Sequence, residues 1–151
     1  MITQIADILS LTGIATTALP LIGAIVSPKN TINYIIVSVV LFVVILGPMI
    51  LKQLIKDPRP ADAMNCNALN GGGSAKDEFG MPSGHMALSS FMIFSTLLIS
   101  TKNPVIWSLG IAWLTAIGWA RYAKHCHSLS QIIGGTVFGT GIALLVRAFT
   151  P

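Results

Sequence analysis

The chain has 151 residues, of which 53% are hydrophobic and 9% are charged, and its mean hydropathy is +0.77. Soluble domains average about 25% charged residues, so this composition excludes an ordinary soluble protein and indicates an integral membrane protein. The formal net charge is +4, but the basic residues flank apolar segments and form no run, which argues against nucleic acid and favours an anionic lipid or a phosphorylated substrate.

Five apolar stretches approach the roughly 20 residues that a helix needs to cross the hydrocarbon. They are Ile8–Ser27, Thr31–Leu51, Ser83–Ser100, Pro104–Arg121 and Leu129–Phe149. The first lacks a basic start and a convincing cleavage site, so we interpret it as a retained span and not a signal peptide. The sequence therefore predicts an all-α fold: one domain over residues 1–151, a polytopic transmembrane helical bundle of about five spans in a multi-pass membrane protein.

One long connection, residues 52–82, separates the second and third predicted spans. A loop of this length in a small protein is usually functional or disordered. Because the other connections are short, helix parity places Lys52, this loop, His85, Arg121 and His127 on one face of the membrane, which we call the site face. Most basic residues of the site face are candidate ligands, which compromises the positive-inside rule and leaves the orientation and the source membrane open.

The third predicted span begins with Pro82-Ser83-Gly84-His85. Ser83 is a predicted N-cap, which would leave the amides of Gly84 and His85 pointing outward. Such a helix terminus binds phosphate through its free N–H groups and its dipole, and His85 would lie beside the anion as a proton donor. For Ser-Gly alone, ordinary helix capping is the alternative.

Cationic side chains flank this helix start in the sequence. Arg59 lies between two prolines that restrict its backbone, and arginine grips phosphate oxygens bidentately, whereas Lys52 would add a point charge. The alternative is that Lys52, Lys56 and Arg59 are interfacial anchors that reach toward lipid head groups.

Two further candidates lie between the last two predicted spans, where Arg121 ends one and His127 precedes the other. An imidazole held near a cationic cluster is predicted to be neutral and nucleophilic. We expect the neighbouring His125 to be structural or interfacial.

The order and spacing of these residues resemble the type-2 phosphatidic acid phosphatase superfamily. Its first motif is Lys, six residues, Arg-Pro; its second is Pro-Ser-Gly-His; its third is Ser-Arg, five residues, His, three residues, Asp. The matches are Lys52 with Arg59-Pro60, then Pro82 to His85, and in part Ala120-Arg121, His127 and Gln131.

The resemblance implies an enzyme that hydrolyses lipid phosphates or diphosphates without a metal or any other cofactor. His127 would attack phosphorus and form a phosphohistidine, and His85 would act as general acid. The phosphoryl oxygens would be held by Lys52, Arg59, Ser83, Gly84 and Arg121. Positioned cations and amides of this kind stabilise the charge that phosphoryl transfer spreads over the equatorial oxygens.

Gln131 stands where the family has the aspartate that orients the nucleophilic imidazole. It lies one helical turn beyond His127, so its amide oxygen could accept the imidazole N–H bond without supplying negative charge. If Gln131 is not the orienting residue, Asp57 and Asp62 are the nearest carboxylates in sequence.

The predicted partners are a lipid phosphate or diphosphate and the membrane, without nucleic acid, in a monomer or homodimer. Soluble vanadium haloperoxidases share the superfamily, but the apolar spans argue against such an enzyme. The alternative from another class is a lipid-binding or scaffolding relative that has lost catalysis with the aspartate. The lipid head group stays open.

Two pairs of small residues complete the predictions. Gly135 and Gly139 lie one turn apart, and we expect them to allow tight packing inside the bundle more than a dimer contact. Cys66 and Cys126 both belong to the site face, and we expect two free thiols. A disulfide would clamp the long loop over the site if this face lies in an oxidising compartment.

Overall fold

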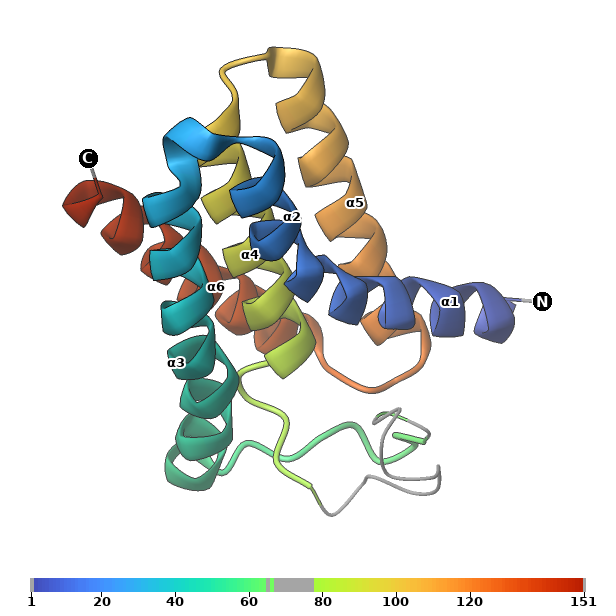
Figure 1. Ribbon diagram of the computed structural model, residues 1–151. Helices are drawn as coiled ribbons and strands as arrows, with labels where there is room; N and C mark the ends of the chain where they lie inside the picture. The colour runs from blue at the N-terminus through green and yellow to red at the C-terminus, as the bar shows by residue number, and fades with distance from the viewer. Residues whose placement is uncertain (1, 65, 67–77, 151) are drawn as a thin grey trace.

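The computed structural model describes residues 2–64, 66 and 78–150 (Figure 1). Part of the long connection, residues 65 and 67–77, lies outside the described residues. The α-helices are α1 (Ile2–Ala15), α2 (Leu19–Val26), α3 (Thr31–Ile55), α4 (Gly84–Ser100), α5 (Pro104–Ala123) and α6 (Leu129–Phe149), with short 3-10 helices at Thr16–Ala18 and Pro28–Asn30. The predicted all-α helical bundle is confirmed.

The stretch predicted as a first span over Ile8–Ser27 is divided into two helices. The Thr16 side chain donates to Gly13 O at 2.6 Å, and Pro20, which has no N–H to donate, lies in the first turn of α2. In Figure 1, α1 runs crosswise to α4 and α5, whereas α2 runs alongside α3. The interruption thus gives α1 and α2 separate directions.

The helix α4 supplies the centre of the core. Phe91 and Met92 are fully buried in one cluster with Val44 of α3, and Ile93 packs in a second cluster with Leu114 of α5. α4 therefore contacts neighbours on several sides.

Glycines let α6 approach α4 closely. A Cβ atom built on Gly135 would collide with the backbone oxygen of Ser83, and one on Gly139 would collide with that of Ala87. Backbone atoms cannot move aside as a flexible side chain can, so these positions require glycine. The two glycines pack inside the molecule, as expected.

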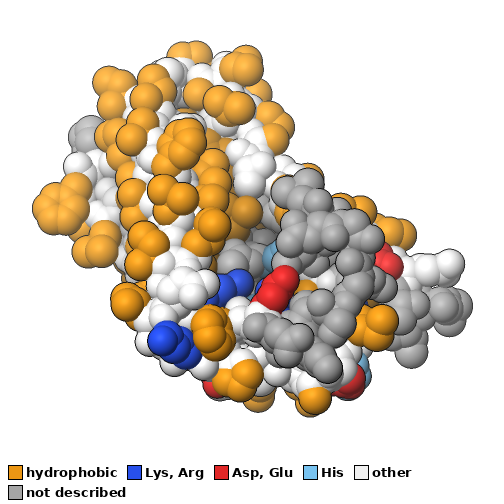
Figure 2. Space-filling view, turned by 90° about the horizontal axis from the view of Figure 1, so that it is seen from below, with side chains coloured by type: hydrophobic (Ala, Val, Ile, Leu, Met, Phe, Trp, Pro, Cys, Tyr) orange, Lys and Arg blue, Asp and Glu red, His pale blue; other side chains and the backbone are white. Residues whose placement is uncertain are grey.

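The outer surface of the bundle is apolar. Large side chains such as Ile25, Phe42 and Val137 are 80%, 69% and 66% exposed, and hydrophobic side chains cover much of the upper left part of the molecule in Figure 2. Among the residues that the structure describes, three stretches are long and apolar enough to cross a membrane, namely Gln4–Val26, Pro28–Ile55 and Leu129–Phe149, while α4 is a shorter apolar helix. Extended exposed apolar surface of this kind is typical of a membrane protein.

Candidate active site

The segment that follows α3 runs beside the segment that precedes α4. Arg59 N donates to Glu78 O at 3.2 Å, and Gly80 N donates to Asp57 O at 2.7 Å. These bonds join the first motif to the residues just before the second, on the face where α3 ends and α4 begins (Figure 1).

The start of α4 joins the second motif to the third. Ser83 is fully buried and caps α4, since its side chain accepts from Met86 N at 3.5 Å, and its own N donates to Gln131 O at 3.0 Å. Gly84 and His85 form the first turn of the helix. His85 Nε2 is buried and has no hydrogen-bond partner among the described residues. A bound anion or leaving group would give this nitrogen a partner.

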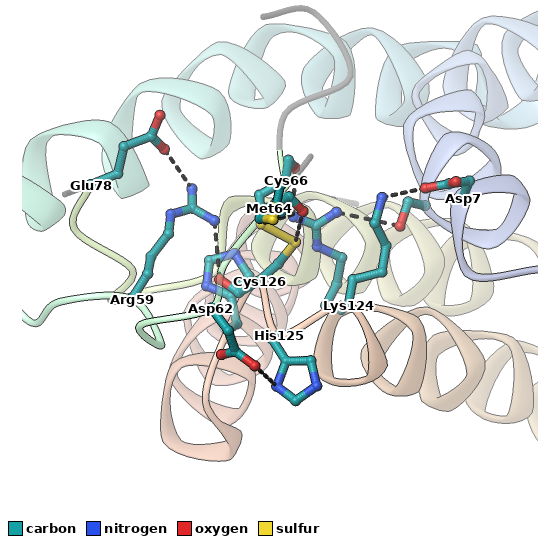
Figure 3. Close-up of a disulfide and its surroundings, with 12 residues drawn as sticks. Asp7, Arg59, Asp62, Met64, Cys66, Glu78, Lys124, His125 and Cys126 are labelled. Carbon is teal, nitrogen blue, oxygen red and sulfur yellow. Dashed lines mark hydrogen bonds and ion pairs between the residues drawn. A yellow bond between two sulfur atoms is a disulfide. The ribbon is translucent and has the colours of Figure 1, made fainter. Parts of the chain in front are cut away.

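The Arg59 side chain, in the loop after α3, is 2% exposed and contacts two other parts of the site face (Figure 3). Its Nη1 donates to Cys126 O at 3.0 Å, and its Nη2 forms a 3.1 Å ion pair with Glu78. Its Nε is buried without a partner within the described ranges. A buried donor left unpaired is costly, which favours an anionic ligand here.

Arg121, in the last turn of α5, is 1% exposed and has a similar set of contacts. Its Nη2 donates to Cys66 O at 2.7 Å and its Nη1 to the Ser10 hydroxyl of α1 at 3.3 Å. Its Nε also lacks a partner in the described part of the chain. Both motif arginines thus keep one buried N–H available for a ligand.

Cys66 and Cys126 form a disulfide, with 5.3 Å between their Cα atoms (Figure 3). The expectation of two free thiols is therefore wrong. The two residues pack with Ala63 in a small buried cluster, so the start of the long loop is brought against the loop after α5. The carbonyl oxygens of the same two cysteines accept the hydrogen bonds from Arg121 and Arg59, so the cross-linked backbone helps to hold both guanidinium groups.

The third predicted cation, Lys52, is half-buried in the last turn of α3. It lies within electrostatic range of Arg59 and Arg121, and all three cations act on His85 and His127. Figure 2 shows Lys and Arg side chains gathered on this face beside acidic ones. The structure brings the three motifs together in one cationic cluster.

His127 lies in the loop between α5 and α6 and is 2% exposed. Burial, together with the positive charges of Arg59, Arg121 and Lys52, holds the pKa of His127 well below its usual value, against a smaller opposing effect of its bond to Gln131. The imidazole is therefore neutral at physiological pH and has an unprotonated nitrogen.

The Gln131 amide determines which ring nitrogen of His127 is unprotonated. Gln131 Nε2 donates to Asp57 Oδ2 at 2.7 Å and to Pro58 O at 2.8 Å, and Oε1 accepts from Ser128 N at 3.2 Å as part of the capping box of α6. His127 Nδ1, 3.2 Å from the same Oε1, must then donate its proton to it. Nε2 of His127 is left as the nitrogen with the free lone pair.

Ser10 and Glu78 take part in these contacts and were not predicted from the sequence as part of the site, whereas the disulfide was named only as the alternative to two free thiols. Ser10 lies far from the motifs in sequence and nothing in its surroundings signals the contact. Asp62, an alternative carboxylate, forms a 3.0 Å pair with His125, and both side chains are more than 60% exposed. This pair lies on the surface, whereas Asp57 contacts the Gln131 amide.

The site presents cationic side chains and backbone amides to a ligand. Over the described ranges, no group of three or more His, Cys, Asp or Glu side chains is arranged to hold a metal ion. Lys52, Arg59 and Arg121 supply positive charge that acts on both His85 and His127.

Comparison with known protein families agrees with the motifs. Residues 31–151, well over half of the chain, match the PAP2 superfamily. The chain therefore belongs to the PAP2 superfamily, and its activity is of the phosphatase type. The matched range includes α3 to α6 and all three motifs, and it begins after α1 and α2. No curated protein and no solved structure matches the chain.

Proposed function

We propose that this protein is a multi-pass membrane phosphatase that hydrolyses a phosphate or diphosphate carried by a lipid, through a phosphohistidine on His127 and without a metal ion. The observation that carries the proposal is a buried His127 whose Nδ1 lies 3.2 Å from Gln131 Oε1 and whose pKa is lowered by burial and by the charges of Arg59, Arg121 and Lys52. Family membership supports the hydrolase activity, whereas the lipid and the intermediate are our inference.

In the first step, the lone pair of His127 Nε2 attacks phosphorus and the bond from phosphorus to the leaving oxygen breaks. The leaving oxygen takes its proton from His85 in its protonated form. The negative charge of the bound phosphoryl group, which Arg59 and Arg121 hold, favours that protonated form of His85. The products are the phosphohistidine and a lipid alcohol, or a lipid monophosphate if the substrate is a diphosphate.

In the second step, water attacks the phosphorus of the phosphohistidine. The N–P bond breaks, its electron pair returns to Nε2 of His127, and His85 takes the proton of the water. Inorganic phosphate leaves, and both histidines recover their starting states. The amides of Gly84 and His85 at the start of α4 stabilise the transferring group in both steps.

A lipid substrate is supported by the apolar surroundings of His85. A cavity of about 190 Å³ adjoins the start of α4 and is lined by Ile14, Val44, Ile45, Gly84, His85 and Leu88. Apart from the histidine these lining side chains are apolar. The cavity suits the first carbons of a lipid chain whose phosphate is bound by the cationic cluster.

The proposal is tested by phosphate release from purified protein. We expect release from at least one of phosphatidic acid, phosphatidylglycerophosphate and a polyprenyl diphosphate, with EDTA present, and weaker release from water-soluble glycerol phosphate. His127→Ala should abolish release and the phosphohistidine trapped from radiolabelled substrate. His125→Ala is the matched control because its exposed side chain lies on the same loop outside the cluster.

Phosphate release that persists in His127→Ala would remove this residue as the nucleophile. Turnover that requires added magnesium would contradict the metal-free mechanism. If wild-type protein binds these lipids but releases no phosphate from any of them, the lipid-binding alternative replaces the enzyme.

A further inference from the structure

We propose that Asp57 is a positioning residue for the nucleophile: by binding the Gln131 amide, its carboxylate keeps His127 in the Nδ1-protonated tautomer. This inference rests on the proposed role of His127. The carboxylate of Asp57 would then orient the imidazole indirectly, through Gln131, which stands where the family has an aspartate in direct contact with the histidine.

The orientation of the Gln131 amide decides the tautomer of His127. In the observed orientation Nε2 faces two acceptors, Asp57 Oδ2 and Pro58 O, and Oε1 faces the fixed donor Ser128 N. If the amide rotated by half a turn, its NH₂ group would face His127 Nδ1, and that nitrogen would have to accept. The proton would then reside on Nε2, which could no longer attack phosphorus.

Asp57 contributes most to this choice between orientations. It accepts at 2.7 Å with a charged oxygen, and charge-assisted hydrogen bonds are about twice as strong as neutral ones. A rotated amide would point its oxygen at the carboxylate and at Pro58 O, which leaves acceptors in contact with one another. The carboxylate also polarises the amide and makes Oε1 a better acceptor as the imidazole gains positive charge.

The backbone holds Asp57 where it can reach Gln131. α3 ends at Ile55 and is capped by Lys56, which has a left-handed conformation (φ 53°) and whose N donates to Lys52 O at 3.0 Å. The next residue is Asp57, and its carbonyl accepts from Gly80 N at 2.7 Å. A Cβ atom on Gly80 would collide with the Gln131 side chain, so the segment before α4 closes directly over the amide. The capped end of α3 and the hydrogen bond from Gly80 N thus hold the backbone of Asp57 in place.

The first test compares Asp57→Asn with Asp62→Asn. The asparagine introduced at position 57 is isosteric but neutral, and it can present either a donor or an acceptor to Gln131. We expect kcat to fall about 10- to 100-fold, as for the loss of a hydrogen bond to a charged group, with KM unchanged. Asp62→Asn removes an acidic side chain from the same face and should leave kcat unchanged.

The second test places a carboxylate at position 131. Gln131→Glu is isosteric, but its new oxygen would face Asp57 and Pro58 O, both acceptors, so we expect lower kcat than in the wild type. In that background Asp57→Asn should raise kcat, because the introduced asparagine can donate to the new carboxylate. A purely structural role for Asp57 predicts that Asp57→Asn lowers kcat in both backgrounds.

The third measurement does not depend on turnover. Nitrogen NMR of histidine-labelled protein should show His127 protonated on Nδ1 in the wild type and in Asp62→Asn, and a mixture of tautomers in Asp57→Asn. The His127 signals are assigned by their loss in His127→Ala.

The outcomes separate the two proposals. If wild-type protein releases phosphate and Asp57→Asn matches it in kcat and tautomer, the role of Asp57 is overturned and the proposed function stands. If wild-type protein releases no phosphate from any lipid, the proposed function fails and the tautomer alone decides the role of Asp57. An unchanged tautomer in Asp57→Asn then overturns it.

Discussion

Glutamine at position 131 makes a demand on its surroundings that an aspartate would not. An aspartate only accepts hydrogen bonds, whereas the buried Gln131 amide also has two N–H donors that need acceptors. Asp57 and Pro58 supply these acceptors at 2.7 and 2.8 Å. The glutamine therefore has a carboxylate in contact with it, one hydrogen bond farther from His127 than an aspartate at position 131 would be.

The charge state of His127 leads to a prediction about pH. Burial and the nearby cations hold its pKa well below the 6.5 of an unperturbed histidine. Below pH 6.5 the unfolded chain therefore binds a proton at this histidine, whereas the folded protein does not until the pH is lower. The contribution of His127 to the free energy of unfolding is thus fully present above pH 6.5 and falls as the pH drops below that value.

Two measurements check this pH dependence. In an NMR titration, His127 should stay neutral at pH 6.5, and Arg59→Gln should raise its pKa toward the usual value by removing one of the cations. His127→Gln should lose part of the decline in melting temperature between about pH 6.5 and pH 5. A His127 that titrates at or above its usual value in the wild type would contradict the prediction.

At the scale of elements, contact between α4 and α6 holds two motifs together. The capping box at the start of α6 places Gln131 one turn from His127, and Ser83 N at the start of α4 donates to Gln131 O at 3.0 Å. The close approach at Gly135 and Gly139 lets both helix starts reach the same place. Helix packing in the core thus positions the site.

This packing predicts different effects for two glycines of the same helix. Gly139→Ala should destabilise the protein by about 1–3 kcal/mol because its Cβ would press on a backbone oxygen of α4. Gly141→Ala is the matched control: nothing lies within 4 Å of its Cβ, so the better helix propensity of alanine should leave stability equal or higher. Thermal unfolding in detergent measures both, and equal melting temperatures would contradict the packing.

Most helices could be predicted from hydropathy and length. The stretches expected over Ser83–Ser100 and Leu129–Phe149 correspond to α4, Gly84–Ser100, and to α6, Leu129–Phe149. The stretch expected over Ile8–Ser27 falls within Gln4–Val26, which is long and apolar enough to cross a membrane, but apolar composition did not reveal that the helix changes direction within it. The threonines and Pro20 marked the break, but they did not give the separate course of α1.

At the scale of the whole molecule, the convergence of the motifs followed from helix parity, but the contacts between loops did not. Parity puts the ends of α3 and α5 beside the starts of α4 and α6. It cannot tell that Glu78 pairs with Arg59, that Ser10 binds Arg121, or that two cysteines meet. These contacts depend on how irregular segments fold in three dimensions, and such segments carry no periodic pattern in the sequence.

The disulfide has a consequence for the orientation in the membrane. Disulfides persist in oxidising compartments and are rare in the cytosol. The Cys66–Cys126 bond lies on the site face, beside both motif arginines. We therefore predict that the site face lies on the side of the membrane away from the cytosol.

Sealed vesicles whose outer surface is the non-cytosolic side of the membrane test this orientation. A membrane-impermeant maleimide should label no cysteine before treatment with an impermeant reductant and two cysteines after it, since the chain contains two.

Reduction should raise KM for the lipid phosphate, because the carbonyl oxygens that hold Arg59 and Arg121 belong to the cross-linked cysteines. It should also lower the melting temperature, because loss of a native disulfide typically costs about 2–5 kcal/mol. The Cys66→Ser/Cys126→Ser double variant should show the higher KM from the start and no response to reductant. Labelling of both cysteines before reduction, or labelling only from the opposite side, would contradict the predicted orientation.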